Sequence, residues 1–168
     1  MKNKLMPTIV LTCICVIVAL LLAVVNTITA PKIEQLQYEK EQAALAKVYP
    51  GGNNFVDIST DRLPASVTKA YTEDGGGYVF QMTVTGYKSG LIIMCGIDPD
   101  GNVTGADFIK SSETLSAEVG LGQSYIGQNS DRFEPILVSG ATKTTNAYAN
   151  AIKAALEAYE ILADKEGK

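Results

Sequence analysis

The feature that most constrains this sequence is an uncharged stretch near its start, Leu5–Pro31. The centre of this stretch, Ile9–Val25, consists almost entirely of Ile, Leu, Val, Ala and Cys. A helix needs roughly 20 apolar residues to cross the hydrocarbon core of a bilayer. We therefore expect residues 1–30 to comprise a short cytoplasmic start and a transmembrane anchor.

A cleaved signal peptide is the alternative interpretation, because Lys2 and Lys4 precede the apolar run as basic residues do in such peptides. The anchor is favoured because the run exceeds the usual apolar core of about 7 to 15 residues. In addition, Pro31 follows the only plausible cleavage site, at Ala30. The two lysines predict that the chain begins in the cytoplasm and that everything after the anchor lies outside.

Charge and composition exclude several classes of function. The chain has 14 Lys and Arg, two of which precede the anchor, against 18 Asp and Glu, so the part beyond the anchor carries a net charge of −6. Nucleic-acid binding needs a basic face and is not expected. Histidine, the commonest general base and metal ligand, is absent. Cys95 is the one cysteine outside the anchor, so no disulfide and no cysteine metal cluster is expected in the domain.

Beyond the anchor, composition divides the chain again. Residues 31–52 include the run KIEQLQYEKEQAALAKVY, which is rich in helix formers and predicts a helical stalk. Proline, glycine and asparagine at 50–54 predict the end of this helix. Residues 53–168 are expected to form one domain of the α+β class, with a small antiparallel sheet and a C-terminal helix.

From Gly77 onward, short β-branched and aromatic runs alternate with turn residues, which is typical of strands. Three successive antiparallel strands are expected at 78–87, 91–97 and 102–109. The turn at 98–101 has proline second and glycine fourth, as a type I turn prefers. This turn explains Asp98 and Asp100, so no metal is assigned.

The final part of the domain combines a helix with a hydroxyl-rich start. Residues 145–164 are rich in alanine and have apolar side chains at three- and four-residue steps, which predicts a helix. The sequence SGATKTT, residues 139–145, lies where an apolar strand at 135–138 is expected to lead into this helix. A helix N-terminus attracts phosphate, and Gly140 lets the backbone approach it. The alternative is that Thr142, Thr144 or Thr145 simply caps the helix.

The chain resembles a known family over most of its length. The anchor ending in AVVNTITAPKI, the segment GYVFQMTVTGYKSGLIIMCGIDPDGNVTGADFIKSSET and the motif SGAT are similar to the G subunit of Rnf-type electron-transport complexes. They are also similar to the related C subunit of sodium-translocating NADH:quinone reductases. Both subunits contain an FMN-binding domain.

This resemblance implies a flavin site. The last residue of SGAT, here Thr142, is esterified to the phosphate of FMN in the family, and a second piece of the site is a Glu-Thr followed closely by Gly-Leu-Gly. The residues expected around FMN are Thr142, Ser139, Gly140, Ala141, Lys143, Thr144, Glu113, Thr114, Gly120, Leu121 and Gly122. Two departures are visible: five residues separate Thr114 from Gly120 where the family usually has a proline, and Ile136 replaces an Asp that the flavin transferase reads.

The resemblance also implies a role. The expected protein is a subunit of an ion-translocating oxidoreductase in a bacterial or archaeal cell membrane, which relays electrons and is not catalytic alone. Its partners would be other membrane subunits and, for maturation, a flavin transferase. Two alternatives remain: a free-standing extracytoplasmic flavin carrier, or a flavin-free anchored interaction module. In the latter, Glu113 is a solvated loop carboxylate and the Gly-Leu-Gly is a plain turn.

Overall fold

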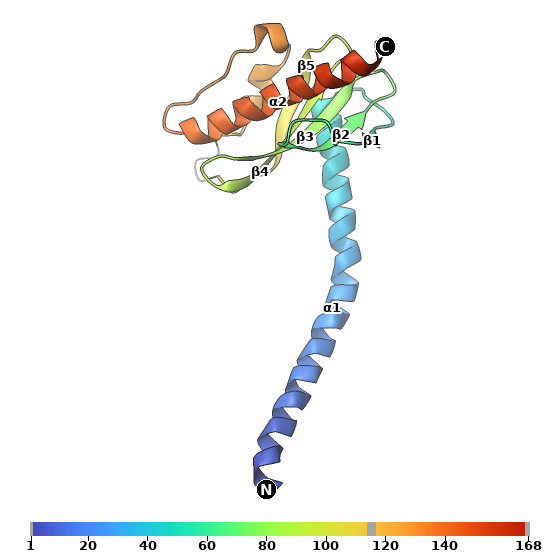
Figure 1. The fold of residues 1–168 in the computed structure, drawn as a ribbon, viewed down its shortest axis with the longest axis vertical. Coiled ribbons are helices and arrows are strands. Elements are labelled where there is room, and N and C mark those ends of the chain that lie inside the picture. The colour runs from blue at the N-terminus through green and yellow to red at the C-terminus, as the bar shows by residue number, and fades with distance from the viewer. Residues whose placement is uncertain (1, 114–116, 167–168) are drawn as a thin grey trace. The chain divides into compact units, whose positions relative to one another are not determined.

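The computed structural model describes residues 2–113 and 117–166, and it contains two long helices and a five-stranded sheet (Figure 1). Two short 3₁₀ helices, Leu121–Tyr125 and Ser130–Arg132, lie between the sheet and the last helix. The chain forms two compact units, Met1–Lys40 and Glu41–Lys168. The α+β class expected from the sequence is confirmed.

Helix α1 runs without interruption over Lys2–Val48, so the expected anchor and stalk are parts of one helix. Among the described residues, the segment Ile9–Lys32 is long and apolar enough to cross a membrane. Pro31 lies inside the helix: it removes one backbone hydrogen bond, but its fixed φ is compatible with helical geometry. The hydroxyls of Thr27 and Thr29 donate to backbone carbonyls one turn earlier (2.8 and 2.7 Å), as polar groups within a membrane must.

The sheet is an antiparallel meander in which each strand pairs with the next along the chain. Its strands are β1 (Val56–Ile58), β2 (Val67–Thr72), β3 (Tyr78–Thr85), β4 (Ser89–Ile97) and β5 (Val103–Lys110). The last three confirm the three predicted strands and their antiparallel order. The first two were not anticipated, because both are short and β2 carries polar residues that weaken its alternation.

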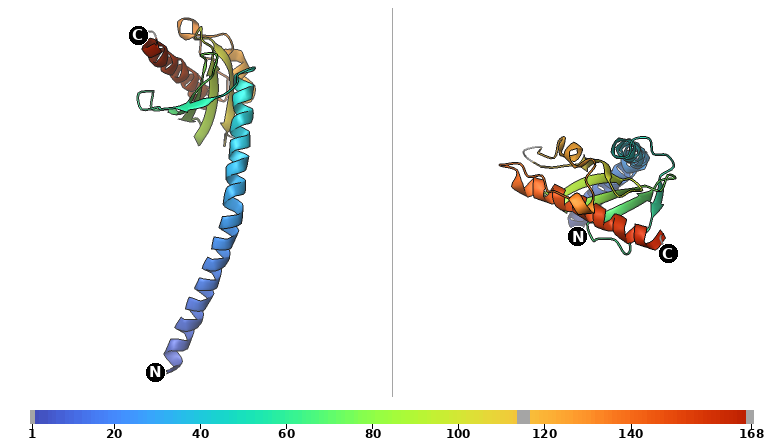
Figure 2. Two further views of the ribbon diagram at one scale, coloured as in Figure 1. Left: turned by 90° about the vertical axis from the view of Figure 1, so that its right-hand side faces the viewer. Right: turned by 90° about the horizontal axis from the view of Figure 1, so that it is seen from above.

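Helix α2, Thr142–Glu166, covers one face of the sheet (Figure 2). It begins three residues before the predicted start at Thr145. The prediction was late because β-branched and hydroxyl-bearing residues in the first turn are more typical of a helix cap than of a helix interior. The main core lies between α2 and the sheet, where Phe80, Tyr148 and Ile152 are completely buried. Near the far end of α2, the hydroxyl of Tyr159 donates to the Pro99 carbonyl (2.6 Å).

The last two turns of α1, Glu41–Val48, cover the opposite face of the sheet (Figure 2). Leu45 and Val48 are fully buried there, in a second cluster that includes Tyr71, Val79 and Met94. Adjacent residues of one strand point to opposite faces, which is why Val79 belongs to this cluster and its neighbour in sequence to the main core.

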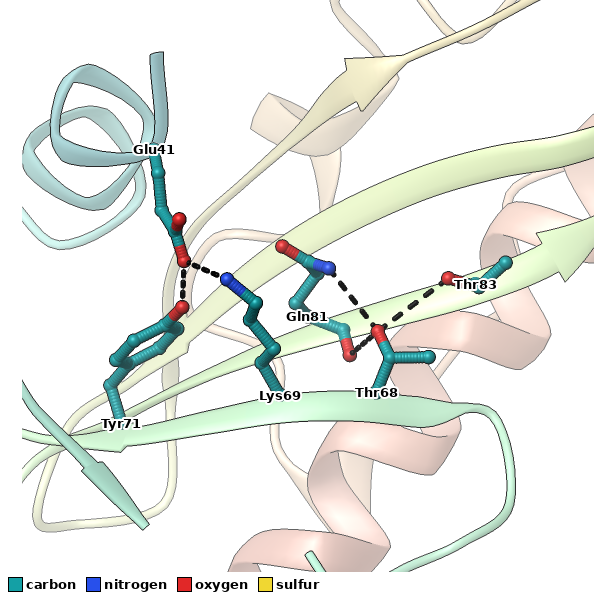
Figure 3. Close-up of polar contacts among 6 residues, drawn as sticks. All are labelled: Glu41, Thr68, Lys69, Tyr71, Gln81 and Thr83. Atoms are coloured by element: carbon teal, nitrogen blue, oxygen red, sulfur yellow. Dashed lines mark hydrogen bonds and ion pairs between the residues drawn. The ribbon is translucent and has the colours of Figure 1, made fainter. Parts of the chain in front are cut away.

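Polar contacts and a pair of glycines hold these turns on the sheet. The carboxylate of Glu41 accepts from Lys69 Nζ (2.6 Å) and from the Tyr71 hydroxyl (Figure 3). Gly96 and Gly105 are partners across β4 and β5, and a Cβ on either would lie 2.5 or 2.7 Å from the Val48 carbonyl oxygen. The end of α1 therefore rests directly on the backbone of the sheet.

Candidate functional site

The first turn of α2 has backbone donors that lie outside the hydrogen-bond ladder of the helix. The first intrahelical bond runs from Thr145 N to the Ala141 carbonyl (3.0 Å), so the N–H groups of residues 142–144 precede the ladder and have no acceptor within the helix. Gly140 adopts a φ of +83°, and a Cβ at this position would meet nothing within 4 Å. The N-terminus of this 25-residue helix thus combines donors without an acceptor in the helix, the positive end of the helix dipole and open space beside Gly140.

The three threonines of this turn have different environments. Thr145 is buried; its hydroxyl donates to the Ala141 carbonyl (3.2 Å) and accepts from Val138 N (3.3 Å), so it stabilises the helix start locally. Thr144 is also buried, and its hydroxyl donates to Glu113 (2.5 Å). Thr142 is exposed, and no hydrogen bond of its hydroxyl is found within the described residues. All three threonines lie inside α2, after the cap position at Ala141, so none of them is the helix cap that the alternative expected. The hydroxyl of Thr142 is left accessible.

Glu113 links three separate segments. Its carboxylate accepts from the backbone N–H groups of Tyr87 (3.0 Å) and Lys88 (3.1 Å), at the tip of the β3–β4 hairpin, and from Thr144 in α2. Burial raises the pKa of Glu113, but the hydrogen bonds from Thr144, Lys88 and Tyr87 outweigh this, and the pKa is lowered from its ordinary value. Glu113 is therefore an ionised, specifically hydrogen-bonded group at neutral pH. A plain solvated loop carboxylate lacks such contacts.

A pocket of about 510 Å³ opens between the hairpin tip and the start of α2. It is lined by Tyr87, Glu113, Gly140, Ala141, Thr142, Lys143 and Thr144. The ammonium group of Lys143 lies 5.9 Å from the centre of the Tyr87 ring. The structure thus brings together six of the residues expected around FMN, from two segments well separated in sequence.

Other predicted site residues lie elsewhere. Ser139 is exposed in the turn before α2 and does not line the pocket. Leu121 is buried in the main core, and a Cβ on Gly122 would lie 1.7 Å from the Ala106 carbonyl oxygen, so Gly122 packs against β5. Gly120, with a φ of +77°, precedes the 3₁₀ helix. Thr114 lies outside the described residues. Contacts of these residues with FMN remain a prediction.

The segment before α2 departs from the expectation of a strand at 135–138. It is irregular, because Pro135 has no N–H and the N–H of Val138 is taken by the Thr145 hydroxyl. Ile136, which replaces the motif Asp, is half-buried against the main core, and its N–H donates to the Tyr125 hydroxyl (3.0 Å). This position therefore has a packing role here.

Tyr87 was missed from the sequence. It was placed at the end of the strand predicted over 78–87, but β3 ends at Thr85 and Tyr87 lies in the turn between β3 and β4. Only the contacts with Glu113 and Lys143, 26 and 56 positions away, place Tyr87 in the pocket.

Comparison with known proteins agrees with this geometry. Residues 86–157 match the family model of the FMN-binding domain, a range that includes the hairpin tip, Glu113 and the start of α2. The chain is also 28 % identical, over 166 aligned residues, to the G subunit of the Na⁺-translocating ferredoxin:NAD⁺ oxidoreductase complex of Acetobacterium woodii. That alignment covers 85 % of this chain and 78 % of the relative. The resemblance to the Rnf-type G subunit is confirmed, and FMN is the cofactor.

The residues present fit this cofactor. A phosphate needs backbone donors and positive charge, which the first turn of α2 and Lys143 supply. The pocket volume lies within the roughly 300–1,000 Å³ typical of small-molecule sites. Because Gly140 leaves open space beside the helix start, a ligand can approach the backbone closely there.

Proposed function

For this relative of the Rnf-type G subunit, whose cofactor is FMN, we propose that the flavin is bound through its phosphate to the hydroxyl of Thr142 and that the protein relays electrons within a membrane complex. The observation that carries this proposal is the position of Thr142. Its exposed hydroxyl lies at the N-terminus of a 25-residue helix and on the wall of the pocket.

The covalent step is a transfer of FMN from a phosphoanhydride donor, in which the phosphate of FMN is joined to the phosphate of a second nucleotide; a flavin transferase catalyses it. The bond between phosphorus and Thr142 Oγ1 forms, the anhydride bond breaks, the second nucleotide leaves as its monophosphate, and the hydroxyl proton is released. The N–H groups of residues 142–144 stabilise the phosphate, and Lys143 adds a positive charge beside it.

The protein contributes position and electrostatics in this mechanism. FMN, when bound, supplies the ability to accept and donate electrons. Glu113 holds the hairpin tip and Thr144 in fixed positions, which keeps the pocket in shape. The chain contains no histidine to serve as a general base, and a relay subunit that is not catalytic alone needs none.

The proposed complex is an ion-translocating oxidoreductase of the Rnf type, in which this protein associates with other membrane subunits. The relative from Acetobacterium woodii is a subunit of such a complex. The segment Ile9–Lys32 anchors the protein, and Lys2 and Lys4 favour a cytoplasmic N-terminus with the domain outside.

The attachment site is tested by co-expression with a flavin transferase, denaturing electrophoresis and flavin fluorescence of the band. Wild type should fluoresce, and Thr142→Ala should lose essentially all of this signal. Ser139→Ala is the matched control, because it removes a nearby exposed hydroxyl and should keep the band bright. Thr144→Ala should also stay bright, although losing its bond to Glu113 should weaken the pocket.

The result that would sink this assignment is a dark band for Thr144→Ala or Ser139→Ala combined with a bright one for Thr142→Ala. A dark wild-type band in the presence of an active transferase would reject covalent attachment altogether. Ile136→Asp restores the motif position and should leave labelling equal or higher, provided that a thermal melt shows the variant folded despite the new carboxyl group against the core.

A further inference from the structure

An exposed aromatic ring stands at the mouth of the pocket. Tyr87 retains 64 % of its surface exposed and is the aromatic member among the described residues that line the pocket. Tyrosine gains most when the faces of its ring are buried against another flat or apolar group. A ring left open beside a cofactor pocket therefore has one face available for packing.

The backbone beneath this ring is fixed. The N–H groups of Tyr87 and Lys88 both donate to the Glu113 carboxylate. Gly86 lies close against the same carboxylate, because a Cβ on it would be 2.6 Å from Glu113 Oε1. A ring carried on a rigid hairpin tip loses little conformational freedom when a ligand packs on it, which favours binding.

The ring also lies close to the segment that carries the attachment residue. Lys143, the residue next to Thr142, places its ammonium group 5.9 Å from the Tyr87 ring centre, within the range of a cation–π contact. Both side chains are exposed, and such contacts are weak in water, so a large planar ligand can replace the lysine at the ring face.

Attachment of the phosphate at Thr142 fixes only one end of FMN. A second contact surface is needed to hold the isoalloxazine ring in a defined position. We propose that Tyr87 provides this surface, and that the isoalloxazine ring of FMN packs against its face. This inference rests on the proposed function, since it requires flavin attached at the start of α2. It assigns to the β3–β4 hairpin a role in holding the redox-active ring.

The test uses the full-length protein in detergent, co-expressed with a flavin transferase. Four proteins are compared: wild type, Tyr87→Leu, Tyr87→Phe and the control Tyr38→Leu, which alters an exposed tyrosine of α1. The readouts are flavin emission per attached flavin and its collisional quenching by iodide. Each is measured before and after denaturation.

Tyr87→Leu should raise iodide quenching of the folded protein by about two- to tenfold, the change expected when one aromatic contact is lost. Its emission should also rise, since a packed tyrosine quenches flavin. Tyr87→Phe keeps the ring and should stay near the wild-type iodide value, and Tyr38→Leu should equal wild type. Thermal melts should be unchanged for the Tyr87 variants, because the side chain is exposed.

Other outcomes separate the two proposals. If flavin is attached and Tyr87→Leu matches Tyr38→Leu in quenching, the packing role of Tyr87 is overturned and the attachment at Thr142 stands. If Tyr87→Leu leaves quenching unchanged but slows electron exchange with the assembled complex, Tyr87 contacts a partner, and the inference is again overturned. A wild type with no flavin in the denatured band overturns both proposals.

Discussion

The two faces of the sheet are closed by helices in different ways. On one face, α2 buries a broad apolar surface that includes Phe80, Tyr148 and Ile152. On the other, the contact within the unit Glu41–Lys168 is made by Glu41–Val48 of α1, with Leu45 and Val48 as its completely buried residues. Both faces are held by the hydrophobic effect, but the second buries fewer side chains and adds a close fit between backbones and a few polar bonds.

This difference shows that a short contact can still be specific. The facing pair Gly96 and Gly105 removes side chains where Val48 approaches, and Thr104 Oγ1 donates to the Val48 carbonyl (2.7 Å). Lys47 pairs with Asp107 (2.5 Å), next to this position. The end of α1 therefore packs on the sheet in one specific position, although the apolar area buried in this contact is small.

The largest expected effect comes from removing the smaller contact. A fragment that starts at Asn53 lacks Leu45 and Val48, and each fully buried side chain of this kind contributes about 1.5–3 kcal/mol. We expect the fragment 53–168 to be less stable than 41–168 by about 3–6 kcal/mol, measured by urea unfolding followed by circular dichroism.

The fragment 31–168 serves as the control and should match 41–168, since the residues before Glu41 belong to the other compact unit. Equal stability of 53–168 and 41–168 would mean that α2 alone holds the domain, and that the boundary expected at residue 53 is sufficient for folding.

The domain boundary expected at residue 53 shows which parts of the fold can be predicted from the sequence and which cannot. The strands β3 to β5 and the turn at 98–101 were predictable, because alternation and turn chemistry are local properties. The packing of α1 on the sheet was not predictable, because nothing in the sequence distinguishes Gly96 and Gly105, which contact Val48, from other strand glycines. A run that is rich in helix formers gives no sign that its last two turns pack on the sheet.

The candidate site was also predictable only in part from the sequence. The motif SGAT directed attention to Thr142, but the assignment of separate roles to Thr142, Thr144 and Thr145 needed the contacts of each hydroxyl. Glu113 was expected near the flavin, whereas its bonds to the hairpin tip depend on the register of β3 and β4. Long-range contacts of this kind leave no local pattern in the sequence.

A single methyl group should disturb the smaller face selectively. In Gly105→Ala, the new Cβ would lie 2.7 Å from the Val48 carbonyl oxygen and 3.0 Å from Val48 Cα, so the helix end must shift. We expect a loss of about 1–3 kcal/mol in the fragment 41–168, as for other overpacked sites. The same change in 53–168 should cost almost nothing, because Val48 is absent. A similar loss in both fragments would place the strain within the sheet.

The smallest expected effect is a pH dependence of the α1 contact. Burial raises the pKa of Glu41, but the bonds from Lys69 and Tyr71 outweigh it, and the pKa is lowered from 4.5. A lowered folded-state pKa contributes stability that is present above about pH 4.5 and lost as the pH falls through the folded-state value.

Accordingly, Glu41→Gln should lower stability at neutral pH by no more than about 1 kcal/mol and should flatten the fall in Tm between about pH 6 and 3. The exposed Glu134→Gln is the control and should keep the wild-type slope. Some slope should remain in the Glu41 variant, because the pKa of Glu113 is lowered in the same direction. An unchanged slope would show that the ion pair with Lys69 does not couple to folding.

The three-way contact of Glu113 also sets an order of events during biogenesis. Lys88 at the hairpin tip lies 25 positions before Glu113, and Thr144 in α2 lies 31 positions after it, so the pocket exists only once the C-terminal helix has been synthesised and docked. If a flavin transferase loads this pocket as proposed, it would act on a finished domain and pass over a nascent chain. Cofactor loading would then report that the domain has folded correctly.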